Sequence, residues 1–238
     1  MGSKDQVIVS KVNNLAIIPA RGGSKGIKKK NLIKVNNVPL IGFTINAIKK
    51  SKKFDRIIVS SDSDEILKTA ISFGAETIKR PKNIARDDSP SEDAVMHVLN
   101  NLPKNHEIEN IGLFQATSPL RTELHIKKSF DQFIKEASET LISVKRIDNK
   151  LLKAFYQEGE DFLPIKENFP FSPRQKLPLA FLPNGAIYLA KFKFFTQSKS
   201  FNSQKMSFYI MSDESSLDID TMNDFNTLKR ILKREANT

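Results

Sequence analysis

Short apolar runs alternate along the chain with longer segments in which apolar residues recur every three or four positions. The runs are typical of buried strands, and the periodic segments are typical of amphipathic helices. Up to Lys135 the pattern predicts, in order, strand Leu15–Pro19, helix Leu40–Lys50, strand Arg56–Ser60, helix Ser63–Phe73, strand Glu76–Lys79, helix Ser91–Leu102, strand Ile111–Gln115 and helix Glu123–Lys135. This alternation indicates an α/β fold, with a mostly parallel sheet covered by helices on both faces.

The alternation stops near Asp148 and returns after Leu182. The segment between them is rich in Phe, Pro and Lys, with only a weak strand signal around residues 151–157. Beyond it we predict strands at residues 185–190 and 207–211 and a helix at residues 222–234. The chain therefore divides into an α/β core, formed by residues 12–147 and 183–238, and an insertion at residues 148–182.

The insertion carries five phenylalanines that its weak secondary-structure signals leave exposed: Phe155, Phe162, Phe169, Phe171 and Phe181. Exposed apolar surface of this kind indicates an interaction site, and a second copy of the chain is the simplest cover for it. The alternative is that the rings pack on their own domain. We predict a homodimer formed through this insertion.

Charge and cysteine content narrow the possible functions. The 38 Lys and Arg against 27 Asp and Glu leave a net charge of +11, which suits a nucleic-acid binder, a membrane-surface protein or an enzyme for polyanionic small molecules. Much of this excess is spread along the chain, as on a solvated surface. The absence of cysteine excludes disulfides, thiolate metal sites and a Cys nucleophile. Without a long apolar stretch or a signal-peptide pattern, we expect a cytoplasmic protein with no membrane partner.

The loop after the first predicted strand has the composition of an anion site. In "PARGGSKGIKKKN", glycines and Ser24 leave backbone N–H groups accessible, while Arg21, Lys25 and Lys30 supply positive charge. The spacing matches neither a Walker A loop nor GxGxxG. Two alternatives stay open, a solvated surface turn and a nucleic-acid site. The second is disfavoured because no aromatic residue interrupts the basic run to provide stacking.

A pair of aspartates near the end of the chain is the candidate metal site. In "SLDIDTMND", Asp218 and Asp220 alternate across Ile219, so an extended backbone points both carboxylates to one side. Mg²⁺ binds through one or two carboxylates together with substrate phosphates. The alternative is that Asp220 or Thr221 caps the following helix.

Other polar residues are single candidates without a supporting pattern: Gln115, Ser118, Arg121, Arg174 and Asn184. A glutamine that ends a buried strand faces the ligand edge of such a sheet, although it can also serve only to hold the next loop. The three histidines, His97, His106 and His125, show no spacing for a metal site or a catalytic triad, and we interpret them as structural.

Taken together, six ordered motifs between Leu15 and Leu232 resemble those of the acylneuraminate cytidylyltransferases, the CMP-sialic-acid synthetases. The motifs are "IIPARGGSKGIKKKN", "FDRIIVSSDSDEI", "RPKNIARDDSPS", "LFQATSPLR", "SPRQKLPLAFLPNGAIY" and "SLDIDT". The resemblance implies a Rossmann-like nucleotidyltransferase sheet, a homodimer, CTP as donor and Mg²⁺ as cofactor. It also implies transfer of CMP to the anomeric hydroxyl of a nine-carbon 2-keto sugar acid, with release of pyrophosphate.

Matching positions carry the family's site residues onto this chain. For the nucleotide they are Arg21, Gly23, Ser24, Lys25, Lys30, Asn31, Arg80 and Ser91, the last two around the cytosine. For the sugar acid they are Gln115, Lys153, Arg174 and Asn184, and for the metal Asp218 and Asp220. In-line transfer needs positioning and charge neutralisation, so Arg21, Lys30 and the two aspartates are the predicted catalytic residues. Asp220 is also a candidate for the group that removes the hydroxyl proton.

One position departs from the family pattern. Sialic-acid-specific members often carry Arg immediately before "PNGAIY", where this chain has Leu182. A leucine there favours a sugar with an apolar group nearby, such as the 9-deoxy carbon of legionaminic or pseudaminic acid. The alternative is that Leu182 faces the core. Two rival functions also remain, a synthetase for eight-carbon (Kdo-type) sugar acids and a nucleic-acid-binding domain.

Overall fold

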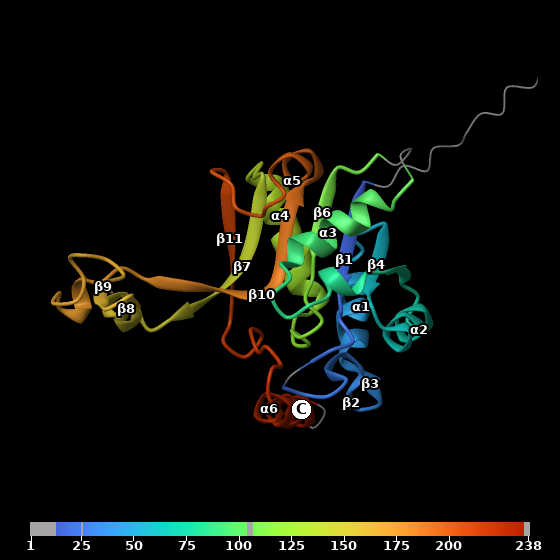
Figure 1. Ribbon diagram of the computed structural model, residues 1–238, viewed down its shortest axis with the longest axis horizontal. Helices are drawn as coiled ribbons and strands as arrows, with labels where there is room; N and C mark the ends of the chain where they lie inside the picture. The colour runs from blue at the N-terminus through green and yellow to red at the C-terminus, as the bar shows by residue number, and fades with distance from the viewer. Residues whose placement is uncertain (1–12, 25, 104–106, 236–238) are drawn as a thin grey trace, which may run out of the picture.

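The computed structural model describes residues 13–24, 26–103 and 107–235, built around one seven-stranded sheet (Figure 1). The strand order is β11-β7-β10-β6-β1-β4-β5. The strands are β1 (Asn14–Pro19), β4 (Arg56–Ser61), β5 (Glu76–Lys79), β6 (Asn110–Leu113), β7 (Thr140–Ile147), β10 (Ala180–Lys191) and β11 (Met206–Met211). Neighbours are parallel, except that β10 runs antiparallel to β6 and β7. The predicted mostly parallel α/β sheet is therefore confirmed.

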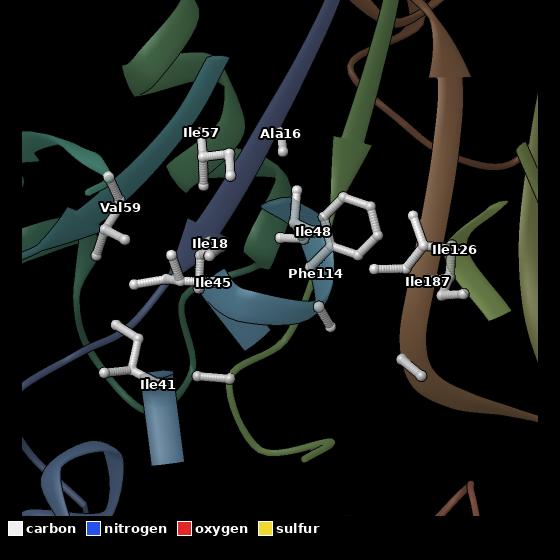
Figure 2. Packing of buried hydrophobic residues seen from close by; sticks show 14 of the residues in the cluster. Ala16, Ile18, Ile41, Ile45, Ile48, Ile57, Val59, Phe114, Ile126 and Ile187 are labelled. Atoms are coloured by element: carbon white, nitrogen blue, oxygen red, sulfur yellow. The ribbon is translucent and has the colours of Figure 1, made fainter. Parts of the chain in front are cut away.

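Helices cover both faces of the sheet. Successive residues of a buried strand point to opposite faces, and in these strands both sets of residues are apolar, so each face needs a cover. The helices are α1 (Leu40–Ser51), α2 (Asp64–Ser72), α3 (Ser91–Asn100), α4 (Glu123–Lys135), α5 (Phe192–Ser198) and α6 (Met222–Glu235). In β1, Ala16 and Ile18 pack toward α1, α2 and α4, whereas Leu15 and Ile17 pack toward α3 and α5. Figure 2 shows the first of these faces, where Ile45 and Ile48 of α1 meet the sheet.

A third, smaller cluster attaches the last helix to the first loop. Ile219, Phe225 and Leu228 pack with Ile27 and Leu40. The short strands β2 (Lys34–Val35) and β3 (Val38–Pro39) form a hairpin next to this cluster, and a single 3₁₀ turn, η1 (Lys30–Leu32), precedes them. The packing brings the region around residue 220 against the loop that follows β1, although about 190 residues separate them in the chain.

The core strand β7 and the helix α5 were not predicted, and neither were the short strands β2, β3 and β9 (Asp161–Pro164). Ser143, Lys145 and Arg146 interrupt the apolar run of β7. Ser143 is nevertheless buried, because its hydroxyl donates to Asn184 Oδ1 (2.6 Å) and accepts from the Ile187 N–H (2.8 Å). Burying a serine costs little free energy when its hydroxyl both donates and accepts a hydrogen bond. The local sequence around Ser143 does not reveal these partners, because they lie on another strand.

The insertion forms an arm, residues 148–179, that leaves the sheet at the end of β7 and returns at the start of β10 (Figure 1). It contains the 3₁₀ turns η3 (Asn149–Lys153) and η4 (Arg174–Lys176) and a hairpin of β8 (Phe155–Glu158) and β9 (Asp161–Pro164). The remaining 3₁₀ turn of the described residues, η2 (Lys82–Ile84), lies outside the arm, between β5 and α3. Of the predicted exposed rings, Phe171 is 94% exposed and Phe162 68%. The arm thus does not bury these two rings within its own chain.

Candidate active site

A cavity of about 220 Å³ opens at the carboxyl ends of β1 and β6. In a sheet of this kind, ligands bind outside the carboxyl ends of the strands. Eight residues predicted for the site line this cavity together: Arg21, Gly23, Ser24, Lys30, Asn31, Arg80, Ser91 and Gln115. They come from the first loop, the end of β5, the start of α3 and the end of β6. Lys25 lies outside the described residues.

The loop after β1 is held by its own polar contacts. The Gly22 N–H donates to Asp62 Oδ1 (2.7 Å), and Asn31 Nδ2 donates to the Arg21 carbonyl (3.0 Å) across the loop. Gly23 has open space where a Cβ would stand, with no atom of residues 13–24, 26–103 and 107–235 within 4 Å. The backbone at Gly23 is therefore accessible to a ligand, as an anion site requires.

Gly26 and Lys30 join this loop to the aspartate pair. A Cβ on Gly26 would lie 2.2 Å from the carbonyl oxygen of Asp220, so only glycine allows the two backbones to approach. Lys30 Nζ donates to Asp220 Oδ1 (2.8 Å), and the Lys30 side chain is only 14% exposed. Lys30 lines the cavity and also contacts Asp220, whereas neither aspartate lines the cavity itself.

The helix cap at the start of α6 leaves both predicted metal ligands available. Thr221 Oγ1 accepts from the Asp224 N–H (3.3 Å), and Asp224 Oδ2 accepts from the Thr221 N–H (2.7 Å). This reciprocal pair is a capping box. The alternative of a helix cap was thus correct for Thr221, whereas the carboxylates of Asp218 and Asp220 take no part in it.

Asp218 is a largely buried carboxylate without full hydrogen bonding. Burial raises the pKa of Asp218, opposed by a hydrogen bond from Thr117, and the nearby Asp220 raises it further. Asp218 Oδ1 has no hydrogen-bond partner among residues 13–24, 26–103 and 107–235. An unpaired buried carboxylate oxygen is costly unless a cation binds to it.

Positive charge surrounds the rest of the cavity. Arg80 is 6% exposed, and burial is the main cause that lowers its pKa. Arg21 Nη1 forms an ion pair with Asp87, which also lines the cavity. Two guanidinium groups and the Lys30 ammonium therefore face a space bordered by open backbone, an arrangement suited to several phosphate groups.

A family model described as cytidylyltransferase matches residues 15–236. The chain belongs to the cytidylyltransferase family. A pseudaminic acid cytidylyltransferase of Campylobacter jejuni subsp. jejuni is 32% identical over 225 residues, 93% of this chain and 97% of the relative. An N-acylneuraminate cytidylyltransferase of Escherichia coli is 32% identical over 214 residues, 89% of this chain but only 50% of that longer relative.

Solved structures agree on the fold of this cytidylyltransferase. A CMP:2-keto-3-deoxy-manno-octonic acid synthetase in complex with CTP has a TM-score of 0.71 at 14% identity, over 94% of this chain and 99% of the other. A 4-diphosphocytidyl-2C-methyl-D-erythritol synthase from Anaerococcus prevotii has a TM-score of 0.65 at 14% identity, over 93% and 98%. At this identity the similarity concerns the fold alone.

Three residues predicted for the sugar acid do not line the cavity of the cytidylyltransferase. Lys153 and Arg174 lie on the arm, where Arg174 Nη2 is 3.5 Å from Asp148 Oδ1. Asn184 is buried in β10, and its Nδ2 donates to Ser216 Oγ (2.8 Å). Its amide oxygen accepts from a neighbouring hydroxyl, so both ends of the side chain are occupied within the protein.

Leu182 lies on the part of β10 that leads into the arm, opposite Lys145 of β7. It is 49% exposed, so the interpretation that it faces the core is wrong. It does not line the cavity either. A role of Leu182 in choosing the sugar substituent therefore stays a prediction.

Six residues that line the cavity were not predicted: Pro19, Arg86, Asp87, Ser89, Ala116 and Thr117. Thr117 and Asp87 line the cavity, the first bonded to Asp218 and the second to Arg21. Both occur inside motifs recognised in the sequence, "LFQATSPLR" and "RPKNIARDDSPS". Their position within those motifs was the available signal. Among the described residues no histidine lines the cavity, and His125 Nδ1 instead accepts from the Thr122 N–H at the start of α4 (3.1 Å).

Proposed function

We propose that this cytidylyltransferase joins CMP from CTP to the anomeric hydroxyl of a nine-carbon 2-keto sugar acid and releases pyrophosphate. One observation carries the proposal: Lys30 lines the cavity and donates to Asp220, so the candidate phosphate loop and the aspartate pair form one site. Relatives named for pseudaminic and N-acylneuraminic acid support the choice of sugar class.

In this proposal the protein acts by binding and orientation. The sugar hydroxyl oxygen bonds to the α-phosphorus, and the bond from that phosphorus to the departing pyrophosphate breaks. Arg21 and Lys30 neutralise the phosphate oxygens, and the open backbone at Gly23 and Ser24 donates to them. Arg80 and Ser91 border the cytosine, with Asn31 holding the loop. Asp220, exposed and beside Lys30, is the candidate acceptor for the hydroxyl proton.

Mg²⁺ fits the aspartate pair. Among the described residues no group of three or more acidic, His or Cys side chains could hold a metal ion. Asp218 and Asp220 would instead provide two carboxylates, leaving phosphate and water to complete the shell, as Mg²⁺ prefers. The unpartnered Oδ1 of Asp218 supports this assignment. When bound, the ion would neutralise phosphate charge and lower the pKa of the attacking hydroxyl.

The sugar acid and the homodimer are linked in this proposal. Gln115 lines the cavity, whereas Lys153 and Arg174 belong to the arm. If all three bind the sugar acid, the arm of one copy has to reach the cavity of another. The exposed apolar rings on the arm support such an association. A guanidinium suits the sugar carboxylate because its planar fork binds both oxygens.

The setting of the reaction is also part of the proposal. No helix in the described part of the chain has the length and apolar character needed to cross a membrane. We assign the enzyme to the cytoplasm, with CTP and the sugar acid as its partners.

Release of pyrophosphate tests the function directly. The purified protein is incubated with CTP, Mg²⁺ and each of a panel of sugar acids: N-acetylneuraminic, legionaminic, pseudaminic and the eight-carbon Kdo. We expect Mg²⁺-dependent release with at least one nine-carbon acid and the smallest rate with Kdo. Preference for Kdo would support the eight-carbon alternative. No release with any acid, together with salt-dependent DNA or RNA binding, would support the nucleic-acid alternative that the +11 charge raises.

The aspartates supply the second test. Asp218→Asn and Asp220→Asn should each lower kcat by roughly 10²–10³-fold, because each removes charge stabilisation at the reacting phosphate. Asp224→Asn is the matched control, since Asp224 is close by but serves the cap of α6. It should lower the free energy of unfolding by about 1 kcal/mol. Because Asp224 Oδ2 also accepts from the Asp220 N–H (3.2 Å), kcat should fall somewhat, but far less than in the two variants above. Near-normal turnover in both of the first two variants would contradict the metal assignment.

A further inference from the structure

Among the described residues Arg121 has the largest fully buried side chain, at 1% exposure, and nothing in the proposed reaction yet uses it. Arg121 ends the segment Gln115–Arg121, which follows β6. Its side chain points back toward Gln115, the first residue of that segment. Arg121 Nη1 donates to the carbonyls of Gln115 (3.1 Å) and Ala186 (2.8 Å), and Nη2 donates to Thr44 Oγ1 (2.6 Å). One side chain thus connects the Gln115 segment, the strand β10 and the helix α1.

This cation is unusual because only uncharged atoms bind it. Within the described part of the chain no carboxylate pairs with Arg121, and burial lowers its pKa to about 9. A buried charge without a partner charge destabilises a fold, and an apolar residue of similar volume would often stabilise it more. Packing alone therefore gives no reason for arginine here. The reason for arginine is its planar guanidinium group, whose N–H groups reach three oxygens on different elements.

Gln115 is held at its backbone carbonyl, and its side-chain amide lies close against Gly185. Thr44 Oγ1 also contacts its carbonyl (3.4 Å), alongside Arg121. On the side-chain end, a Cβ at Gly185 would lie 2.4 Å from Gln115 Oε1, and Gly185 has φ +74°. Glycine leaves the space that the amide occupies. Since Gln115 lines the cavity, these contacts decide how its amide is presented to a ligand.

The same segment also reaches the aspartate pair. The Thr117 hydroxyl is bonded to Asp218, and the Ile219 N–H donates to the Thr117 carbonyl (2.9 Å). A displacement of the segment would therefore appear at Ile219, far from Arg121 in sequence. The Ile219 amide provides a readout that does not depend on turnover.

We propose that Arg121 is a positioning residue that fixes Gln115 for binding of the sugar acid. The inference rests on the proposed function in assigning Gln115 to that substrate. Arg121 itself touches no substrate, because it lies beneath the segment and is closed off from solvent. Lysine at this position keeps the charge but loses the fork that spans the three acceptors.

Steady-state kinetics of Arg121→Lys test the role. We expect the KM for the sugar acid to rise about tenfold or more, with the KM for CTP changed less than about twofold. In a Gln115→Ala background the same substitution should add no further change, because the group it positions is gone. Arg56→Lys, in a surface ion pair with Glu76, is the control and should alter neither KM. Equal effects on both KM values, or full additivity with Gln115→Ala, would overturn the proposal.

Hydrogen exchange gives an independent readout. In Arg121→Lys the amides of Gln115–Arg121 and of Ile219 should exchange faster than in the Arg56→Lys control, at equal global stability. Unchanged exchange there would also overturn the proposal. If Arg121→Lys does not fold, Thr44→Val removes one acceptor of the same network and should shift the same quantities less. If the wild-type enzyme turned over no sugar acid, the proposed function would fail, while the exchange result would still decide whether Arg121 holds the segment.

Discussion

At the scale of single residues, Asp218 shows a conflict between function and stability. Its carboxylate is buried with one oxygen unpartnered, and burial raises its pKa above the ordinary value of 3.8. The folded protein therefore holds this proton more tightly than the unfolded chain. Stability contributed by the protonated group is lost as the pH rises from the unfolded pKa through the folded pKa, and the loss persists at neutral pH.

Asp218→Asn should consequently raise the melting temperature at pH 7 in the absence of Mg²⁺, even though we expect it to abolish most turnover. The gain should shrink as the pH falls and disappear below pH 3.8, where the wild-type carboxyl is protonated in both states. Thermal unfolding of both proteins between pH 3 and pH 8 measures this. A constant difference across that range would show that the ionised carboxylate is not the cause.

At the scale of elements, the contact of the first loop with the segment before α6 depends on one glycine. Gly26→Ala places a Cβ 2.2 Å from a backbone oxygen of Asp220, and the third apolar cluster restrains both partners. We expect loss of about 1–3 kcal/mol in the free energy of unfolding and a strong fall in kcat. Chemical denaturation and the pyrophosphate assay measure the two effects.

Gly23→Ala is the matched control for this loop, since a Cβ there meets no atom of the described residues within 4 Å. Its free energy of unfolding should stay within about 0.5 kcal/mol of the wild type. Because Gly23 lines the cavity, its KM for CTP should nevertheless rise. Equal destabilisation by both substitutions would contradict the close approach inferred at Gly26.

The elements that the sequence predicted well are those with an unbroken local pattern. The strand Glu76–Lys79 and the helix Glu123–Lys135 have the same bounds in the structure. The strand β7 was missed because Ser143 and two basic residues break its apolar run. In the structure Ser143 bonds to β10, and the two basic residues pair across the sheet with residues of β10 or face solvent. These partners are distant in the chain, so the local sequence does not indicate them.

At the scale of the whole molecule, the arm is the clearest candidate for an association surface. Phe162 and Phe171 are its most exposed rings, at 68% and 94%, whereas Ile71 of α2 is an exposed apolar residue on the core, at 59%. In light scattering we expect a mass near twice the 26.9 kDa of one chain. Phe162→Asp combined with Phe171→Asp should lower it to that of one chain, and Ile71→Asp should not. A wild-type monomer would contradict the homodimer.

The sequence by itself determined the α/β alternation, the family and most of the cavity lining, because these depend on local periodicity and on short motifs. It also identified Asp218 and Asp220 as a pair. Only the tertiary structure decided that Lys30 contacts Asp220, that Thr221 rather than Asp220 caps α6, and that Arg121 reaches back to Gln115. The reason is physical: each of these contacts is set by how sheet and helices pack, which brings together atoms that no local pattern connects.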